Sequence, residues 1–218
     1  MSSNLSNALT LSVAIIIVAT AAGCAPSALE APRPVQPGAP GEATRPATTT
    51  QANNSRPAEY VQADVEFMQG MIAHHAQALA MAALVPARTD DEDIRLIAER
   101  IEVSQNYEIG AMQNWLAERG EMVPTPNDAM HEAMAHHEHM PGMITPQQMA
   151  ELEAARGDEF DQLFLRFMIG HHLGALTMVD QLFATPGAGQ ESEVFQIAEG
   201  IAGDQKIEIN RMRQLLVS

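Results

Sequence analysis

Two pairs of adjacent histidines occur in this sequence within the same local pattern of apolar residues. His74-His75 begin three residues after Met71, and His171-His172 begin three residues after Met168. Imidazole nitrogen and methionine sulfur both bind copper, with histidine favouring Cu(II) and methionine favouring Cu(I). A lone histidine on an apolar helix face is usually a satisfied core residue. Two duplicated pairs flanked by methionine instead favour metal ligation.

A third group of candidate ligands lies between the two histidine pairs. Residues 130–143 contain four histidines and four methionines, and a short His-rich tract is typical of metal binding. The Pro141-Gly142 turn can bring the sulfur atoms of Met140 and Met143 to one ion. Alternatively, the methionines of the tract cover the open end of the fold as apolar plugs, and both roles are compatible. The candidate ligands in this tract are His131, His136, His137, His139, Met134, Met140 and Met143.

The composition excludes several other chemistries. The 218 residues carry 12 Lys and Arg against 28 Asp and Glu, a formal net charge of −16. This balance argues against nucleic acid as a partner, because phosphate binding needs clustered cations. A single cysteine excludes an intramolecular disulfide and Cys-rich zinc or iron–sulfur sites. The chain contains no Glu-x-x-His, which argues against a di-iron oxidase centre.

A duplicated helical hairpin must position the histidine pairs. The pattern from Asp64 to Met81 recurs 97 residues later, and the pattern from Ile97 to Met112 recurs 100 residues later. Apolar residues repeat with helical spacing in all four segments, and Thr145-Pro146 is expected to begin the third helix as N-cap and first-turn proline. Four long helices with two short turns and one longer link predict an all-α four-helix bundle. The predicted helices span about residues 59–85, 90–119, 146–184 and 190–216.

Polar residues recur inside the apolar faces of these predicted helices. At about 100° per residue, His75 lies in the middle of one inner face, and Glu108 lies within the inner face of the next helix. Buried polar groups without partners cost about 1–3 kcal/mol each. Two interpretations of these buried polar residues remain open. They form a structural network in which His and Glu satisfy each other, or they support metal ligands. The predicted core polar network consists of Asp64, Gln105, Glu108, Asp161, Gln205 and Glu208.

The first 58 residues are expected to lie outside the helical fold. Residues 9–22 form an apolar run of 14, which suits the hydrophobic region of a signal peptide. The run leads through small residues into Cys24, as in a bacterial lipobox, where the cysteine is lipidated. A plainly cleaved secretory signal is the alternative, and a buried structural cysteine fits this sequence poorly. The predicted divisions are a lipoprotein-type signal peptide (1–23), a disordered Pro/Ala/Thr-rich tether (24–58) and the bundle domain (59–218).

The repeated hairpin, the Gln-x-x-Glu-Ile-x-x-Met pattern of its second helix and Met140-Pro141-Gly142-Met143 together resemble domain-of-unknown-function family 305. The resemblance covers about residues 59–216. It implies a ferritin-like four-helix fold in secreted or periplasmic bacterial proteins, some of which bind copper and are linked to copper tolerance. Carried over to this sequence, the resemblance implicates as ligands Met71, His74, His75, Met168, His171, His172, Met140 and Met143.

Three classes of function are compatible with these residues. The leading hypothesis is an extracytoplasmic copper-binding protein that buffers, scavenges or carries Cu(I) or Cu(II) by ligand exchange. A lipid on Cys24 would anchor it to the outer face of the cytoplasmic membrane, and its acidic surface would raise the local cation concentration. The alternatives are a ferritin-like metal-dependent oxidase, for which no catalytic constellation is recognised, and a metal-free structural lipoprotein with a buried His, Glu and Gln network.

Overall fold

The computed structural model describes residues 35–36, 45–46, 59–135 and 140–217 of the chain. The chain divides into two units, Met1–Ser55 and Arg56–Ser218. In the first unit, β1 (Val35–Gln36) pairs antiparallel with β2 (Arg45–Pro46), a short ladder that the sequence did not predict. The predicted signal peptide, Cys24 and most of the tether lie outside the described residues. No helix in the described part of the chain is long and apolar enough to cross a membrane.

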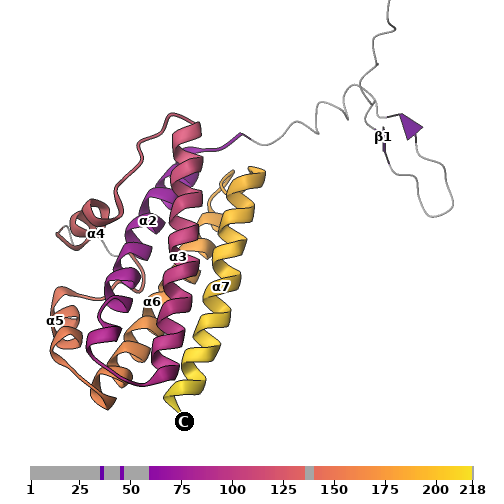
Figure 1. Cartoon of the computed structure of the whole chain (residues 1–218). Helices are drawn as coiled ribbons and strands as arrows, with labels where there is room; N and C mark the ends of the chain where they lie inside the picture. Colours follow the sequence, from indigo (N-terminus) through magenta and orange to yellow (C-terminus); the bar gives the residue numbers. More distant parts are fainter. Residues whose placement is uncertain (1–34, 37–44, 47–58, 136–139, 218) are drawn as a thin grey trace, which may run out of the picture. The chain divides into compact units, whose positions relative to one another are not determined.

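The second unit is a bundle of four long helices (Figure 1). The predicted architecture of two repeated hairpins is confirmed, because α2 packs against α3 and α6 packs against α7. Contacts between α2 and α6 and between α3 and α7 close the bundle. A short 3-10 turn, η1 (Val85–Ala87), lies in the first hairpin connection. The four helices are α2 (Gln62–Ala82), α3 (Glu92–Glu118), α6 (Asp158–Ala184) and α7 (Ser192–Leu216).

Acidic caps fix where the second helix of each hairpin begins. The Asp91 carboxylate accepts hydrogen bonds from the backbone N–H groups of Asp93 and Ile94 at 2.9 and 3.1 Å. One hundred residues later, the Glu191 carboxylate accepts from the second and third residues of α7 in the same way. These bonds satisfy amide groups that have no partner inside the helix. The repeat therefore extends to the helix starts.

The predicted third helix, 146–184, is instead two helices. Thr145 caps α5 (Pro146–Ala154) as expected, and its hydroxyl accepts from the Gln148 N–H at 3.2 Å. Gly157 then adopts φ +56°, a conformation that side chains disfavour, and its N–H donates to the Arg88 carbonyl at 2.8 Å. The chain turns at this point before α6 begins. The link between the hairpins also contains α4 (Pro126–Ala135), which the sequence analysis did not predict.

The end of the link is fastened to the bundle by two positions that break the repeat. The Gln77 amide pairs with Ile144, donating to its carbonyl at 2.9 Å and accepting from its N–H at 2.8 Å. The position equivalent to Gln77 in the second hairpin is Gly174, where an added Cβ would overlap the Pro141 carbonyl. Gly142 has φ +80° and approaches the same part of α6. The Met140–Met143 turn therefore rests directly on α6.

Replacing Gly174 with alanine is expected to destabilise the fold by about 1–3 kcal/mol, because the new methyl group would push the Met140–Met143 turn away from α6. Urea unfolding followed by circular dichroism measures this change. Gly170→Ala is the matched control, since it lies one turn earlier on α6 and its Cβ would meet no other atom within 4 Å. Equal effects of the two substitutions would contradict the described docking of the turn.

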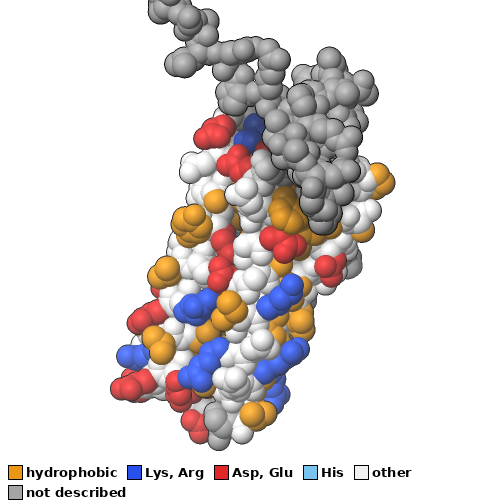
Figure 2. Space-filling view, turned by 90° about the vertical axis from the view of Figure 1, so that its right-hand side faces the viewer, with side chains coloured by type: hydrophobic (Ala, Val, Ile, Leu, Met, Phe, Trp, Pro, Cys, Tyr) orange, Lys and Arg blue, Asp and Glu red, His pale blue; other side chains and the backbone are white. Residues whose placement is uncertain are grey.

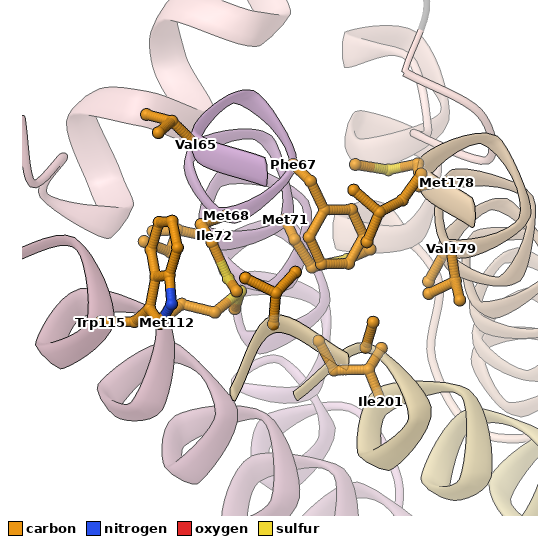
Figure 3. Packing of buried hydrophobic residues seen from close by; sticks show 14 of the residues in the cluster. Val65, Phe67, Met68, Met71, Ile72, Met112, Trp115, Met178, Val179 and Ile201 are labelled. Carbon is orange, nitrogen blue, oxygen red and sulfur yellow. The ribbon is translucent and has the colours of Figure 1, made fainter. Parts of the chain in front are cut away.

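Apolar side chains form two buried clusters, one toward each end of the bundle. The first contains Met71, Met112 and Trp115, and Figure 3 shows Phe67 of α2 and Met178 of α6 facing each other within it. The second contains Phe160, Phe164 and Met168 among others. Along each long helix, the segment between the two clusters carries polar residues whose side chains are buried. The histidine pairs belong to this central segment.

Candidate metal centre

A buried polar layer crosses the middle of the bundle between the two apolar clusters. Two residues from each long helix contribute to it, and each is at most 7% exposed. On the face of the molecule in Figure 2, acidic, basic and isolated apolar side chains alternate, and no histidine shows among the described residues. The polar layer consists of His74, His75, Gln105, Glu108, His171, His172, Gln205 and Glu208.

Two histidines of the layer are each held by a carboxylate on the partner helix of their own hairpin. His75 Nε2 lies 2.6 Å from Glu108 Oε2, and His172 Nε2 lies 2.9 Å from Glu208 Oε2. When it is ionised, each carboxylate only accepts, so it then selects the tautomer with hydrogen on Nε2 and leaves Nδ1 with a lone pair. Both Nδ1 atoms are buried without a hydrogen-bond partner. Metal-binding histidines are commonly oriented by a carboxylate in this way.

The other two histidines stack on each other across the two hairpins. The ring centroids of His74 and His171 lie 3.8 Å apart with the planes inclined by 37°. His74 Nε2 donates to the Pro141 carbonyl at 2.9 Å, which leaves its Nδ1 as a buried lone pair without a partner. Neither ring nitrogen of His171 makes a hydrogen bond of normal geometry. The turn that carries Met140 and Met143 is thus bonded directly to the stacked pair.

Burial keeps His74, His75 and His171 neutral. Removal from water lowers the pKa of His74 and of His75 to about 3, and neighbouring imidazoles add to the effect. The pKa of His171 is lowered well below its ordinary value for the same reasons. Burial, together with the carboxylates of Asp204 and Glu208, raises the pKa of Glu108 to about 8. Neutral imidazole is the form that binds metals, so His74, His75 and His171 are in that form at neutral pH.

Two members of the predicted core polar network do not belong to this layer. Asp64 is buried at the start of α2, where its carboxylate accepts from the Val61 and Gly189 N–H groups at 2.8 and 2.7 Å. Asp161 lies in the first turn of α6 and accepts from the Thr89 hydroxyl at 3.1 Å. Their grouping with the central residues is wrong, because helix starts lie at the ends of the bundle. Gln105, Glu108, Gln205 and Glu208 are buried in the central layer, where the side-chain amides of Gln105 and Gln205 have no hydrogen-bond partner among the described residues.

The candidate sulfur ligands lie in different surroundings. Met71 is packed in the first apolar cluster and Met168 in the second, and both are fully buried. Met140 packs against the first cluster, near Gly70, where an added Cβ would lie 3.6 Å from the Met140 sulfur. Met143 is half-buried in the same turn. Of these sulfurs, the two in the turn are the ones carried by a segment bonded to His74.

The remaining candidate ligands lie beyond the polar layer. His131 is exposed on α4. His136, His137 and His139 lie outside the described residues, as does the side chain of Met134. Among the side chains that the structure describes, no three from His, Cys, Asp and Glu are arranged to hold one ion. Histidine nitrogen together with methionine sulfur is a mixture that favours a soft metal.

Sequence reasoning missed two contacts that shape this centre. It did not anticipate the Pro141 carbonyl as the partner of His74 or the stacking of His74 on His171. One signal was available, since Gln77 and Gly174 occupy equivalent positions but differ completely in size and polarity. Both positions contact the link. A difference inside an otherwise regular repeat therefore marks where another segment docks.

Comparison with known proteins places this fold in a family. The domain-of-unknown-function model DUF305 matches residues 64–216. A crystal structure of a DUF305 fragment from Deinococcus radiodurans is 30% identical, with a TM-score of 0.63, covering 74% of this chain and 98% of that chain. A putative secreted DUF305 protein from Streptomyces coelicolor is also 30% identical, with a TM-score of 0.59, covering 71% of this chain and 92% of that one.

Two further matches concern a copper-bound protein and a viral one. CopM in its Cu(II)-bound form is 26% identical, with a TM-score of 0.53, covering 70% of this chain and 95% of that chain. The uncharacterized protein L153 of Acanthamoeba polyphaga mimivirus is 39% identical over 56 residues, which are 26% of this chain. That match spans only 37% of the viral protein. The sequence model and the solved structures agree on the helical domain, and the chain belongs to the DUF305 family.

Proposed function

We propose that this chain is an extracytoplasmic copper-binding protein that buffers, scavenges or carries the metal. One observation carries the proposal: His74, His75 and His172 each have Nε2 next to an acceptor and Nδ1 buried without a partner. Buried polar atoms without partners are rare in folded proteins and call for an explanation. A soft cation would satisfy these lone pairs, whereas a purely structural histidine network leaves them unmatched.

The proposed ligands fall into a buried set and a capture set. The buried set comprises the four histidines of the polar layer, together with the sulfurs of Met140 and Met143, and Met71 and Met168 as further sulfur donors. Histidine favours Cu(II) and thioether favours Cu(I), so a mixed set can accept either oxidation state. The capture set would bind ions first and pass them inward by ligand exchange; it comprises His131, His136, His137, His139 and Met134.

Glu108 and Glu208 act as positioning residues in this proposal. Each carboxylate holds one histidine through Nε2 and so keeps the Nδ1 lone pair available. A proton on Glu108 would allow the carboxyl group to donate to Nε2 instead and would remove that selection. Because burial raises the pKa of Glu108 to about 8, metal binding at His75 is expected to strengthen as the pH rises toward 8.

The known relatives support copper and export across the membrane. CopM has been crystallised with Cu(II), at 26% identity to this chain, and with Ag, at 25% identity. Silver is a soft ion, consistent with ligands that favour Cu(I). The relative from Streptomyces coelicolor is described as a secreted protein. Together with the apolar run at residues 9–22, this supports an extracytoplasmic location, and Cys24 is the proposed lipid attachment site.

Metal titration of the full-length chain tests the proposal. Native mass spectrometry with Cu(I), Cu(II) and Zn(II) is expected to show copper bound stoichiometrically at micromolar concentrations and zinc bound more weakly. Absence of bound copper under these conditions would contradict the proposed function and favour a metal-free structural role. Replacing His131, His136, His137 and His139 together with alanine is expected to remove ions from the capture set while the buried set still binds. An unchanged stoichiometry would show that the tract is not a site.

A further inference from the structure

A pocket of about 700 Å³ lies between α3 and α7, the two helices that run side by side in Figure 1. Glu108, Asp204 and Gly200 line it, together with the side chains of Ile197 and Asn114. Glu108 is 7% exposed, and its Oε1 atom is buried without a hydrogen-bond partner. A buried carboxylate oxygen with no donor is costly unless something supplies one. Glu108 Oε1 therefore needs a hydrogen-bond donor that the described residues do not supply.

The second hairpin shows how the equivalent carboxylate is satisfied. Glu208 Oε1 accepts from the Ser104 hydroxyl at 2.9 Å and lies 3.4 Å from Arg100 Nε. Arg100 also pairs with Asp204 at 3.1 Å. The side chains that neutralise Glu208 therefore come from α3 of the other hairpin, and the cation among them is a guanidinium group. Only the outer oxygen of Glu208 uses these partners, because Oε2 faces His172.

The repeat places no such cation beside Glu108. At the offset of 100 residues, Gly200 stands where Arg100 would be and Asp204 stands where Ser104 would be. The second hairpin thus has no side chain in place of the Arg100 cation, and it has a carboxylate in place of the Ser104 hydroxyl donor. An added Cβ at Gly200 would meet no atom within 4 Å, so the space is open. Gly200, Asp204 and Glu108 all line the pocket.

We propose that this pocket binds the cationic end of an alkylguanidinium or alkylammonium compound, which takes the place that the Arg100 guanidinium holds beside Glu208. The cation would donate to Glu108 Oε1 and face Asp204, in a charge-assisted arrangement. Ile197 and Ala111 in the pocket wall offer apolar surface to an alkyl stem, as lysine and arginine stems use elsewhere.

The chemistry of the pocket favours an organic cation over a metal ion. No three His, Cys, Asp or Glu side chains in the described part of the chain are arranged to hold one ion. A guanidinium or ammonium group needs only one or two carboxylates and contacts them through N–H donors. This site shares Glu108 with the proposed copper centre, but it uses the Oε1 atom of that residue and none of the proposed copper ligands, which are nitrogen and sulfur atoms. Copper binding could therefore fail its test while this site passes, and the reverse also holds.

Agmatine, which carries a guanidinium and an ammonium group on one alkyl chain, is the probe for this site. Titration into the full-length chain, followed by ¹H–¹⁵N NMR, is expected to shift the amide signals of α3 and α7 around Gly200 and Asn114. Gly200→Arg would place a tethered guanidinium beside Glu108 and is expected to weaken agmatine binding at least about tenfold. Gly203→Arg is the matched control, because it adds the same charge to an exposed position of α7 outside the pocket.

The outcomes separate the proposal from nonspecific attraction to an acidic protein. Saturable agmatine binding that Gly200→Arg removes and Gly203→Arg retains supports the site. Absence of saturable binding at millimolar agmatine, or an equal loss in the two arginine variants, would overturn it. Competition by Mg²⁺ without any agmatine binding would overturn it as well. The peptide Ala-Arg-Ala then distinguishes the source of the cation: binding equal to agmatine supports an arginine side chain, and weaker binding supports a free amine.

Discussion

Replacing His75 and His172 together with alanine is expected to lower the affinity for Cu(I) by more than about 100-fold, because loss of an outer-shell partner alone costs about 10–100-fold at metal sites. The substitution removes two of the Nδ1 lone pairs that lie buried without a partner. Competition with a chromophoric Cu(I) chelator measures the change. His131→Ala is the matched control, since it removes an exposed histidine that lies on α4. We expect that variant to keep the affinity of the buried set.

A milder pair of substitutions tests the same claim in case the alanine variant does not fold. His75→Ala with His172→Ala leaves Glu108 and Glu208 without their partners, which destabilises a buried layer. Glu108→Gln with Glu208→Gln keeps both histidines and the side-chain volumes, but an amide selects the Nε2–H tautomer less strongly than a carboxylate does. This double variant is expected to bind copper about 10–100-fold more weakly. Wild-type affinity in both folded double variants would show that these residues do not bind or position the metal.

The stability of the metal-free protein is expected to peak near pH 6.5 and to fall on both sides. Below pH 6.5 the unfolded chain protonates His74, His75 and His171, whereas the folded chain keeps His74 and His75 neutral to about pH 3 and His171 neutral well below its ordinary pKa. Stability gained from neutral histidine is therefore lost as the pH falls. Glu108 acts in the opposite direction, because its folded pKa of about 8 exceeds the unfolded value of 4.5. Its contribution is lost as the pH rises toward 8.

The size of the acid effect follows from proton counting. Between pH 4.5 and 6.5, the unfolded chain binds more protons than the folded chain at His74, His75 and His171, and fewer at Glu108. The free energy of unfolding should then fall as the pH falls, by about 1.4 kcal/mol per pH unit for each proton that the unfolded chain binds in excess. Urea denaturation across this range measures the slope.

A single substitution measures the contribution of one histidine to this pH dependence of the free energy of unfolding. His171→Phe removes an imidazole that makes no hydrogen bond of normal geometry and whose pKa is lowered by burial, so the fall in stability with falling pH should become shallower. At neutral pH the same variant is expected to be more stable by about 1–3 kcal/mol, because two unpartnered buried nitrogens disappear. A His171→Phe slope equal to that of the wild type would contradict the buried, neutral state of His171.

The four-helix bundle was predictable because the repeat imposes the same apolar spacing twice. The central positions of His75, Glu108 and their counterparts follow from that spacing alone. Asp64 shares the same helix face as His75, yet it lies at the start of α2 and caps that helix. Periodicity reports the face of a helix but not the distance along it at which a polar side chain meets others. A capping role competes with a core role wherever an acidic residue falls in the first turn.

The link was less predictable, because it obeys neither the repeat nor a single helical period. The break at Gly157 depends on a tertiary hydrogen bond to the Arg88 carbonyl, which no local pattern encodes. The position of the Met140–Met143 turn depends on Gln77 and Gly174, one of which supplies hydrogen bonds and the other space. The sequence predicted that this turn could bring sulfur to a metal. Its contact with His74 through the Pro141 carbonyl required the folded structure.

Long-range ¹H–¹⁵N NMR of the histidine rings during titration with Cu(I) tests the central claim most directly. In the metal-free protein above pH 8, where Glu108 is ionised, the spectrum should assign His74, His75 and His172 to the Nε2–H tautomer, because each Nε2 lies next to an acceptor. One equivalent of Cu(I) should then shift the Nδ1 signals of the buried histidines while Nε2 stays protonated. Unchanged Nδ1 signals at those residues, with shifts confined to the histidines of residues 131–139, would contradict a copper site in the polar layer.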